Sequence, residues 1–129
     1  MAGSSPSTSD GPAPTQASPD CLFCRLVAGE VPADRVYEDD DVVAFRDVNP
    51  QAPTHVLVIP RAHVADVGEL ALQDPALVSA VLRGVREVAR REDAASYRLV
   101  FNTGPDAGQS VPHVHGHVLA GRSLRWPPG

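Results

Sequence analysis

Apolar residues recur from Cys21 onward in short blocks whose spacing predicts helices and strands. The first block favours a short helix near residues 21–29. Alternating apolar positions then predict two strands, near residues 35–39 and 42–47, on either side of an acidic turn. An apolar run at Thr54–Pro60 indicates a third, buried strand that ends at its proline.

A long amphipathic helix is predicted to begin at Asp74 and Pro75, which suit the N-cap and the first helical position. It runs to about Asp93, and its arginines fall mostly outside the apolar stripe. The stripe repeats with helical period through Leu77, Val78, Val81, Leu82, Val85 and Val88.

The last part of the chain predicts two more strands, joined by a loop rich in glycine and proline. The first lies in residues 96–104, the loop follows to residue 112, and the second strand starts at His113. Residues 121–129 contain too much proline for regular structure. Since helices and strands mix without regular alternation, we expect an α+β fold with a mainly antiparallel sheet.

The first 20 residues differ in composition from the rest. They contain no Val, Leu, Ile, Phe, Tyr or Trp, so we expect residues 1–20 to form a disordered tail. This segment has no basic start and no apolar stretch, and it does not resemble a secretory signal. The remaining length, about 109 residues, suffices for one compact domain over 21–129.

Charge and cysteine content narrow the range of partners. The net charge is −5, and all 11 basic residues are arginine, without a cationic tract. We therefore expect no electrostatic binding to nucleic acid or membranes. The absence of lysine excludes a phosphate-binding loop of the Gly-Lys-Ser/Thr kind and lysine covalent chemistry. Two cysteines without a secretion signal, and no segment apolar enough to span a membrane, indicate a cytoplasmic protein.

Three histidines occupy alternate positions, His113, His115 and His117. Residues two apart on a strand share a face, so the three side chains are expected to line one side of the last strand. Such neighbours lie ~7 Å apart and the outer pair ~13 Å apart. With metal–nitrogen bonds of ~2 Å, one ion reaches two of the three at most. At least one histidine is therefore free for nucleophilic or acid–base chemistry.

The loop before these histidines is suited to binding an anion. Gly104, Gly108, Gln109 and Ser110 form a turn of small residues that opens into the histidine strand. Glycine allows a close approach of the backbone to a ligand, and successive N–H groups in such turns form hollows for anions. The Ser110 hydroxyl adds a donor for a phosphate oxygen or a leaving group.

These residues carry a resemblance to a known family. The run His-Val-His-Gly-His-Val-Leu resembles the signature of the histidine triad (HIT) nucleotide-binding family. NTGPDAGQSVPHVHGHVLAGR, the terminal WPPG, YEDDDVVAFRDVNPQAPTHVLVIPRAH and CLFCRLVAGEVPA resemble its Hint branch, the purine nucleoside phosphoramidases. The resemblance covers about residues 21–129. Gly116 is smaller than the apolar residue usual in its slot, and it faces away from the histidines.

The resemblance implies a catalytic mechanism. His115 would be the nucleophile, attacking the α-phosphorus of a nucleoside monophosphate derivative, and water would release the nucleotide from the resulting nucleotidyl-histidine. His117 would contact the phosphate and help to protonate the leaving amine. Ser110 would bind the leaving group or phosphate, and His55 and Asn102 would complete the polar wall. No organic cofactor is implied.

The resemblance also implies a purine nucleotide site. Asp47 would accept the ribose hydroxyls, and the loop residues Gly108 and Gln109, with Ser110, would surround the phosphate. Arg46 replaces the histidine expected beside that aspartate. The base slot would consist of Leu22, Phe23, Leu26, Phe45, Val48 and Leu57, some of which also belong to the core.

The implied fold is a five-stranded, mainly antiparallel sheet with one long and one short helix. The family forms homodimers in which two such sheets join into one of ten strands. In the Hint branch the C-terminal segment crosses toward the partner's site, so Trp126 would contact substrate bound to the other subunit. The alternative is a tryptophan that covers its own core.

Cys21 and Cys24 have the C-x-x-C spacing of a zinc site, but two ligands do not close a tetrahedron. Many bacterial triad proteins, and the related galactose-1-phosphate uridylyltransferases, complete such a site with two histidines. The matching positions here are His63 and His113, which implies a structural zinc of the bacterial type. Two plain buried cysteines are the alternative.

Three hypotheses for function follow. The first is a nucleoside phosphoramidate hydrolase that acts through His115 and releases AMP. The second is a zinc hydrolase in which His113 and His115 hold a catalytic ion beside an activated water. The third is a nucleotide-binding or interaction protein without enzymatic activity, which the intact His115 disfavours.

Overall fold

The structure, a computed structural model, describes residues 17–129. The expected disordered tail therefore lies mostly outside the described residues, and the boundary at residue 20 stays a prediction. In chain order the elements are α1 (Leu22–Val27), β2 (Arg35–Glu38), β3 (Val42–Arg46), β4 (Thr54–Pro60), α2 (Val67–Gln73), α3 (Pro75–Arg91), β5 (Tyr97–Phe101), the short 3-10 helix η2 (Pro105–Ala107) and β6 (Gly116–Ala120).

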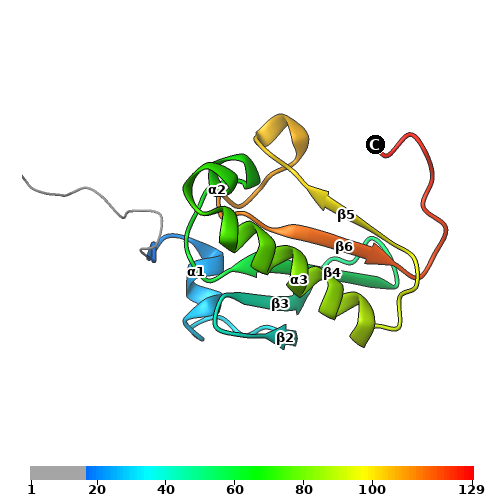
Figure 1. Cartoon of the computed structure of the whole chain (residues 1–129), viewed down its shortest axis with the longest axis horizontal. Helices are drawn as coiled ribbons and strands as arrows, with labels where there is room; N and C mark the ends of the chain where they lie inside the picture. Colours follow the sequence, from blue (N-terminus) through cyan, green and yellow to red (C-terminus); the bar gives the residue numbers. More distant parts are fainter. Residues whose placement is uncertain (1–16) are drawn as a thin grey trace, which may run out of the picture.

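The five strands form one antiparallel sheet in the order β2-β3-β4-β6-β5 (Figure 1). The central strand β4 pairs with β3 and β6, so that Leu57 lies opposite Phe45 on one side and His117 on the other. The expected α+β architecture, with a five-stranded antiparallel sheet, is confirmed. Among the described residues, no helix is long and apolar enough to cross a membrane.

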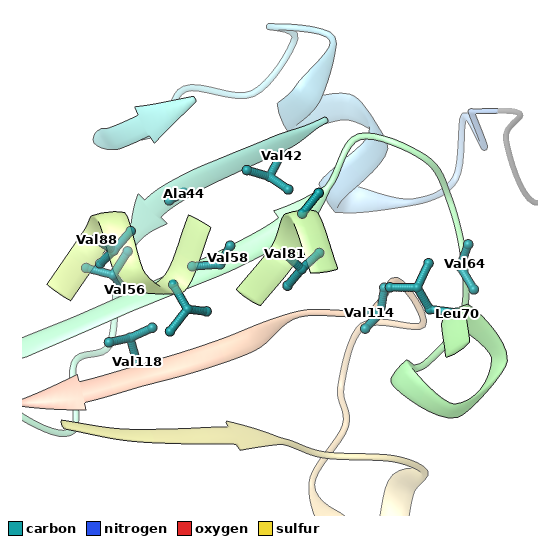
Figure 2. Close-up of a cluster of buried hydrophobic side chains, with 12 residues drawn as sticks. Val42, Ala44, Val56, Val58, Val64, Leu70, Val81, Val88, Val114 and Val118 are labelled. Atoms are coloured by element: carbon teal, nitrogen blue, oxygen red, sulfur yellow. The ribbon is translucent and has the colours of Figure 1, made fainter. Parts of the chain in front are cut away.

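The sheet separates two apolar clusters. On one face, α3 packs its valines against alternate strand residues, including Val42, Val58 and Val118 (Figure 2). On the other face, α1 packs Phe23 and Leu26 against the strand residues that point the opposite way. Because strand side chains alternate, residues of β3 and β4 contribute to both clusters.

The long helix α3 forms as predicted. The Asp74 carboxylate accepts a hydrogen bond from the Leu77 N–H, and Pro75 occupies the first turn. Five of the six expected apolar positions are buried or half-buried, but Leu82 is 46% exposed and lies outside the apolar contact.

The structure adds a second short helix, α2, which the sequence pattern did not predict. The Asp66 carboxylate caps it by accepting from the Glu69 N–H. Leu70 is its one buried residue, so its apolar periodicity is too weak to detect. The Asp-x-x-Glu start was the available signal, since it has the spacing of a capping box.

The last strand begins later than expected, at Gly116, so His113 and His115 precede it and only His117 lies within it. The reason is a long-range contact: the Val114 N–H donates to the Val64 carbonyl oxygen (2.7 Å), outside the sheet. The alternation of side chains nevertheless holds, because Val114 and Val118 both pack into the α3 cluster. The expectation of one continuous histidine strand was wrong, while the shared face was right.

Candidate active site and metal centre

A cavity of about 550 Å³ opens on the sheet face opposite α3. Of the expected catalytic residues, His115, His117 and Ser110 line it; of the expected nucleotide-binding residues, Asp47 does so as well. All six residues of the expected base slot also line it: Leu22, Phe23, Leu26, Phe45, Val48 and Leu57. The cavity therefore joins a polar region with titratable side chains to an apolar region.

His115 is held with one ring nitrogen facing away from the backbone. Its Nδ1 lies 2.8 Å from the main-chain oxygen of His113. A carbonyl oxygen only accepts, so Nδ1 carries the proton and, in the neutral ring, Nε2 keeps its lone pair. The ring is 6% exposed and packs edge-on against Phe23 at 5.1 Å between centroids. The hydrogen bond and this packing thus hold the His115 ring in one orientation at the cavity wall.

His55 and His117 are joined in a directed hydrogen-bond chain. The Gln51 N–H donates to His55 Nδ1 (3.0 Å), so His55 carries its proton on Nε2. That Nε2–H donates to His117 Nδ1 at 2.9 Å. Neutral His117 therefore has its proton on Nε2, where it serves as a hydrogen-bond donor. The main-chain N–H of Gln51 therefore determines which nitrogen of each ring carries the proton. A main-chain group leaves no signal in the sequence.

Burial disfavours the positively charged form of both rings. Desolvation, with smaller contributions from His115 and His55, lowers the pKa of His117 to about 4. Desolvation also lowers the pKa of His55. The nearby Asp47 carboxylate opposes both shifts, because it favours the positive form of each ring.

Asp47 is anchored beside the pair. Its Oδ1 accepts from the Asn49 N–H (2.8 Å), and its Oδ2 lies 3.4 Å from His55 Nε2. Its neighbour Val48 is fully exposed yet lines the cavity, which places it on the rim. Arg46 also lines the cavity, but its guanidinium is bound to Glu92 at 2.7 and 2.8 Å, at the end of α3.

The loop before the histidines is fastened by Gln109. Its side chain accepts from the Gly104 N–H and donates to the carbonyl oxygens of Ala65 and Val111. Gly108 has φ +94°, a conformation that favours glycine. Asn102, Gly108 and Gln109 do not line the cavity, whereas Ser110 does. Gln109 thus shapes the loop that presents Ser110.

One expected site residue lies away from the cavity, and several residues that were not expected line it. Trp126 is 82% exposed and does not line the cavity. Sequence reasoning missed the segment between α1 and β2, which lines the cavity through Val31, Pro32, Ala33 and Asp34, and it also missed Val111. This segment has no catalytic side-chain pattern, so only its place in the fold reveals it.

The four expected metal ligands converge at one point. The ligand atoms of Cys21, Cys24, His63 and His113 all lie within 4.8 Å of one another. The Sγ atoms of Cys21 and Cys24 lie 3.5 and 3.6 Å from His113 Nδ1. The His63 Nδ1 atom is 3.3 Å from both the Cys24 Sγ and the His113 Nδ1. The ligand atoms thus form a compact group.

These distances fit a tetrahedral ion. Zn–S bonds of ~2.3 Å and Zn–N bonds of ~2.0 Å place neighbouring ligand atoms roughly 3.3–3.8 Å apart. His113 Nε2–H donates to the Pro60 carbonyl oxygen (2.8 Å), which leaves Nδ1 free as a ligand. Burial raises the pKa of the Cys24 thiol and lowers the pKa of His113 to about 4. A divalent cation would stabilise the thiolate form instead.

A second group of potential ligands, Asp47, His55 and His117, is less suited to a metal. The 2.9 Å between the His55 and His117 nitrogens is a hydrogen-bond distance, shorter than the ~3.3 Å separation of two nitrogens on one tetrahedral zinc. Among the described residues, His115 belongs to neither potential metal group. The zinc hydrolase hypothesis, which needs His113 and His115 on one ion, therefore has no supporting ligand set there.

Comparison with known proteins agrees with this geometry. Residues 28–124 match the model of the HIT domain. A HIT-like protein of Synechococcus elongatus is 50% identical over 113 residues, covering 87% of this chain and 99% of the relative. Among solved structures, a HIT family hydrolase from Legionella pneumophila is 45% identical with a TM-score of 0.81, covering 85% of this chain and 100% of that chain.

A histidine triad protein from Clostridium difficile is 38% identical, also with a TM-score of 0.81, over 85% of this chain and 97% of that chain. The matched residues 28–124 contain all five strands of the sheet and the three histidines. The chain therefore belongs to the HIT domain family.

Proposed function

We propose that the protein is a nucleoside phosphoramidase of the Hint branch, which hydrolyses the P–N bond of adenosine 5′-monophosphoramidates and releases AMP. The observation that carries this proposal is the hydrogen bond from His115 Nδ1–H to the His113 carbonyl oxygen. It holds the ring in the tautomer whose Nε2 lone pair is available for attack on phosphorus.

The reaction proceeds in two displacements. His115 Nε2 bonds to the α-phosphorus while the P–N bond breaks, and the electron pair of that bond stays on the leaving nitrogen. The leaving nitrogen takes a proton from cationic His117. Water then attacks phosphorus, the N–P bond to His115 breaks, and the water proton returns to His117.

The charge on His117 is coupled to substrate binding. In the free site its pKa is about 4, so the ring is neutral near pH 7. A bound phosphoramidate places negative charge beside Nε2, which raises that pKa toward neutrality. In the cation both His117 nitrogens carry protons, so the His55 Nε2–H shifts from His117 Nδ1 to the Asp47 carboxylate, whose Oδ2 lies 3.4 Å from it. The carboxylate then stabilises the added positive charge.

The nucleoside portion lies along the same cavity. Asp47 retains acceptor capacity beyond the Asn49 N–H and would bind the ribose hydroxyls. The base would occupy the apolar slot between α1 and the sheet, where Phe23 and Phe45 are 5.5 Å apart. Ser110 would donate to the phosphate or the leaving nitrogen. The Asn102 side chain lies near Gly108 of the glycine loop and does not line the cavity.

A structural zinc would be held by Cys21, Cys24, His63 and His113. The ion would supply a cross-link between α1, the segment after β4 and the segment before β6. The protein residues then keep their own roles: Cys21 caps α1 by accepting from the Cys24 N–H, and His113 supports His115 through its carbonyl oxygen.

We also propose a homodimer built through β5. This strand is at the edge of the sheet, and pairing it with a second copy would give ten strands. The exposed Trp126 is suited to contact with the partner's substrate. The two free cysteines suit a reducing compartment such as the cytoplasm.

The test is AMP release from adenosine 5′-phosphoramidate, measured for the intact protein, for His115→Ala and for chelator-treated protein of verified fold. We expect release that is lost in His115→Ala and retained after chelation. Loss on chelation from protein that is still folded would support a catalytic metal instead. Binding of AMP without turnover by the intact protein would support a nucleotide-binding or interaction protein.

A further inference from the structure

A second cavity, of about 260 Å³, adjoins the first. Three residues, Leu22, Ser110 and Val111, line both cavities. The other walls of the second cavity come from the entry to α1, from His63 and from Pro112. Cys21 and His63, two of the proposed zinc ligands, are among these residues, but no part of the substrate has yet been placed in this space.

Ser110 relates the second cavity to the reacting atoms. It shares the first cavity with His115 and His117, so the α-phosphorus must lie within this polar region. In an in-line displacement the leaving nitrogen lies opposite the attacking His115 Nε2, away from the nucleoside. The base slot and Asp47 occupy the nucleoside side, and the space past Ser110 is therefore available to the substituent of the leaving amine.

The charge of the second cavity indicates what that substituent carries. Asp20, an exposed carboxylate at the start of α1, lines this cavity and not the first. No lysine or arginine is among its lining residues. Within residues 17–129, no side-chain hydrogen bond or ion pair engages the Asp20 carboxylate. An ammonium group would gain a partner there, whereas a carboxylate would be repelled.

We propose that the second cavity is a subsite for the leaving amine, and that Asp20 selects amines that carry a second, positively charged ammonium group. This inference rests on the proposed phosphoramidase function and names its substrate class. Ser110 marks the boundary between the phosphate and the amine substituent.

The test uses two AMP conjugates that differ only in end charge: AMP joined through a P–N bond to a linear diamine, and AMP joined to an alkylamine of equal length. The zinc-loaded protein is expected to favour the diamine conjugate about two- to fivefold in kcat/KM, the range of a partly exposed ion pair. Asp20→Asn should reduce this ratio to about one, because a carboxamide keeps the shape and loses the charge.

Asp106→Asn is the matched control, since Asp106 lies in the loop that leads to Ser110 but lines neither cavity. It should keep the ratio of the intact protein. A ratio of one in the intact protein, or an unchanged ratio in Asp20→Asn, overturns the subsite. An equal loss in both variants does the same, because it indicates a general effect of net charge.

Failure of the subsite and failure of the proposed function are separated by binding. The Kd of both conjugates is measured by calorimetry in His115→Ala, with and without Asp20→Asn. A Kd ratio that follows Asp20 supports the subsite even if the intact protein does not hydrolyse the conjugates. Equal Kd values for the two conjugates overturn it, whatever the turnover.

Discussion

The main-chain oxygen of His113 accepts the Nδ1–H of His115 at 2.8 Å, so a candidate metal ligand directly orients the candidate nucleophile. The His113 ring points to the cysteines while its carbonyl group points to the next histidine of the triad. A metal that fixed the His113 ring would therefore also fix the carbonyl group that orients His115.

This relationship predicts the tautomers of the histidines. In 15N-labelled protein near pH 7, long-range 1H–15N spectra should show His115 protonated on Nδ1, and His113 and His55 protonated on Nε2. Single histidine variants assign the signals. An Nε2-protonated His115 would contradict the orientation on which the proposed nucleophile depends.

Metal binding is expected to stabilise the fold. The protein should contain one Zn²⁺ per chain by elemental analysis, and its removal should lower the Tm, since the ion binds the folded ligand set preferentially. Cys24→Ala and His63→Ala should lose the metal, because each removes a ligand. His115→Ala should retain it. Equal zinc content in all three variants would rule out this site.

The pH dependence of stability should include a contribution from His117. Its pKa falls from 6.5 to about 4 on folding, so the unfolded state binds more protons between these values. This contribution is fully present above pH 6.5 and is lost as the pH falls toward 4. The Tm of the intact protein should therefore drop more between pH 7.5 and 4.5 than that of His117→Asn. Parallel curves would show that His117 titrates normally.

Gly116 should resist enlargement. A Cβ at this position would lie 3.0 Å from Leu99 Cδ1 and from two ring carbons of Phe101. Gly116→Ala is expected to lower the free energy of unfolding by about 1–3 kcal/mol through overpacking. Adding Phe101→Leu should recover part of the loss, measured as a coupling between the two substitutions in urea unfolding. Wild-type stability in Gly116→Ala would contradict this packing.

The ion pair between Arg46 and Glu92 connects the end of β3 to the end of α3. Arg46 lowers the pKa of Glu92, whose side chain is 12% exposed. The stabilisation is therefore present above about pH 4.5 and is lost as the pH falls below it. A cycle of Arg46→Met, Glu92→Gln and both should give a coupling of about 1 kcal/mol at pH 7. Additive effects would show that the pair is only a surface contact.

Much of the fold could be predicted from the sequence because its elements carry strong periodic signals. The long helix has six apolar positions at helical spacing and a capping aspartate, and Val56–Pro60 is a continuous apolar run. Helix α2 has only Leu70 buried, so it lacks an apolar pattern, and the spacing of Asp66 and Glu69 is its one sequence signal. The start of β6 depends on the bond between Val114 and Val64, which are far apart in sequence.

The candidate site, like the fold, could be predicted from the sequence only in part. The triad spacing and the C-x-x-C spacing are visible in the sequence, and the four ligands that the resemblance implied, Cys21, Cys24, His63 and His113, lie together in the structure. The role of Gln109 could not be predicted in this way. Its side-chain amide binds main-chain groups of Gly104 and Ala65, and the sequence does not show which main-chain groups lie near it. The tautomer of His55 depends on a main-chain N–H from Gln51, and no residue type encodes that contact.

The alternation between valines and histidines from residue 113 to residue 118 has a consequence for changes in chain length. Val114 and Val118 belong to the apolar cluster on the α3 side of the sheet, while His115 and His117 face the cavity. Inserting or deleting one residue between His113 and His117 would exchange the two sides for part of this segment. It would bring an imidazole into the valine layer and a valine into the cavity. We therefore expect natural variation here to consist of substitutions, with insertions and deletions confined to the loop before residue 110.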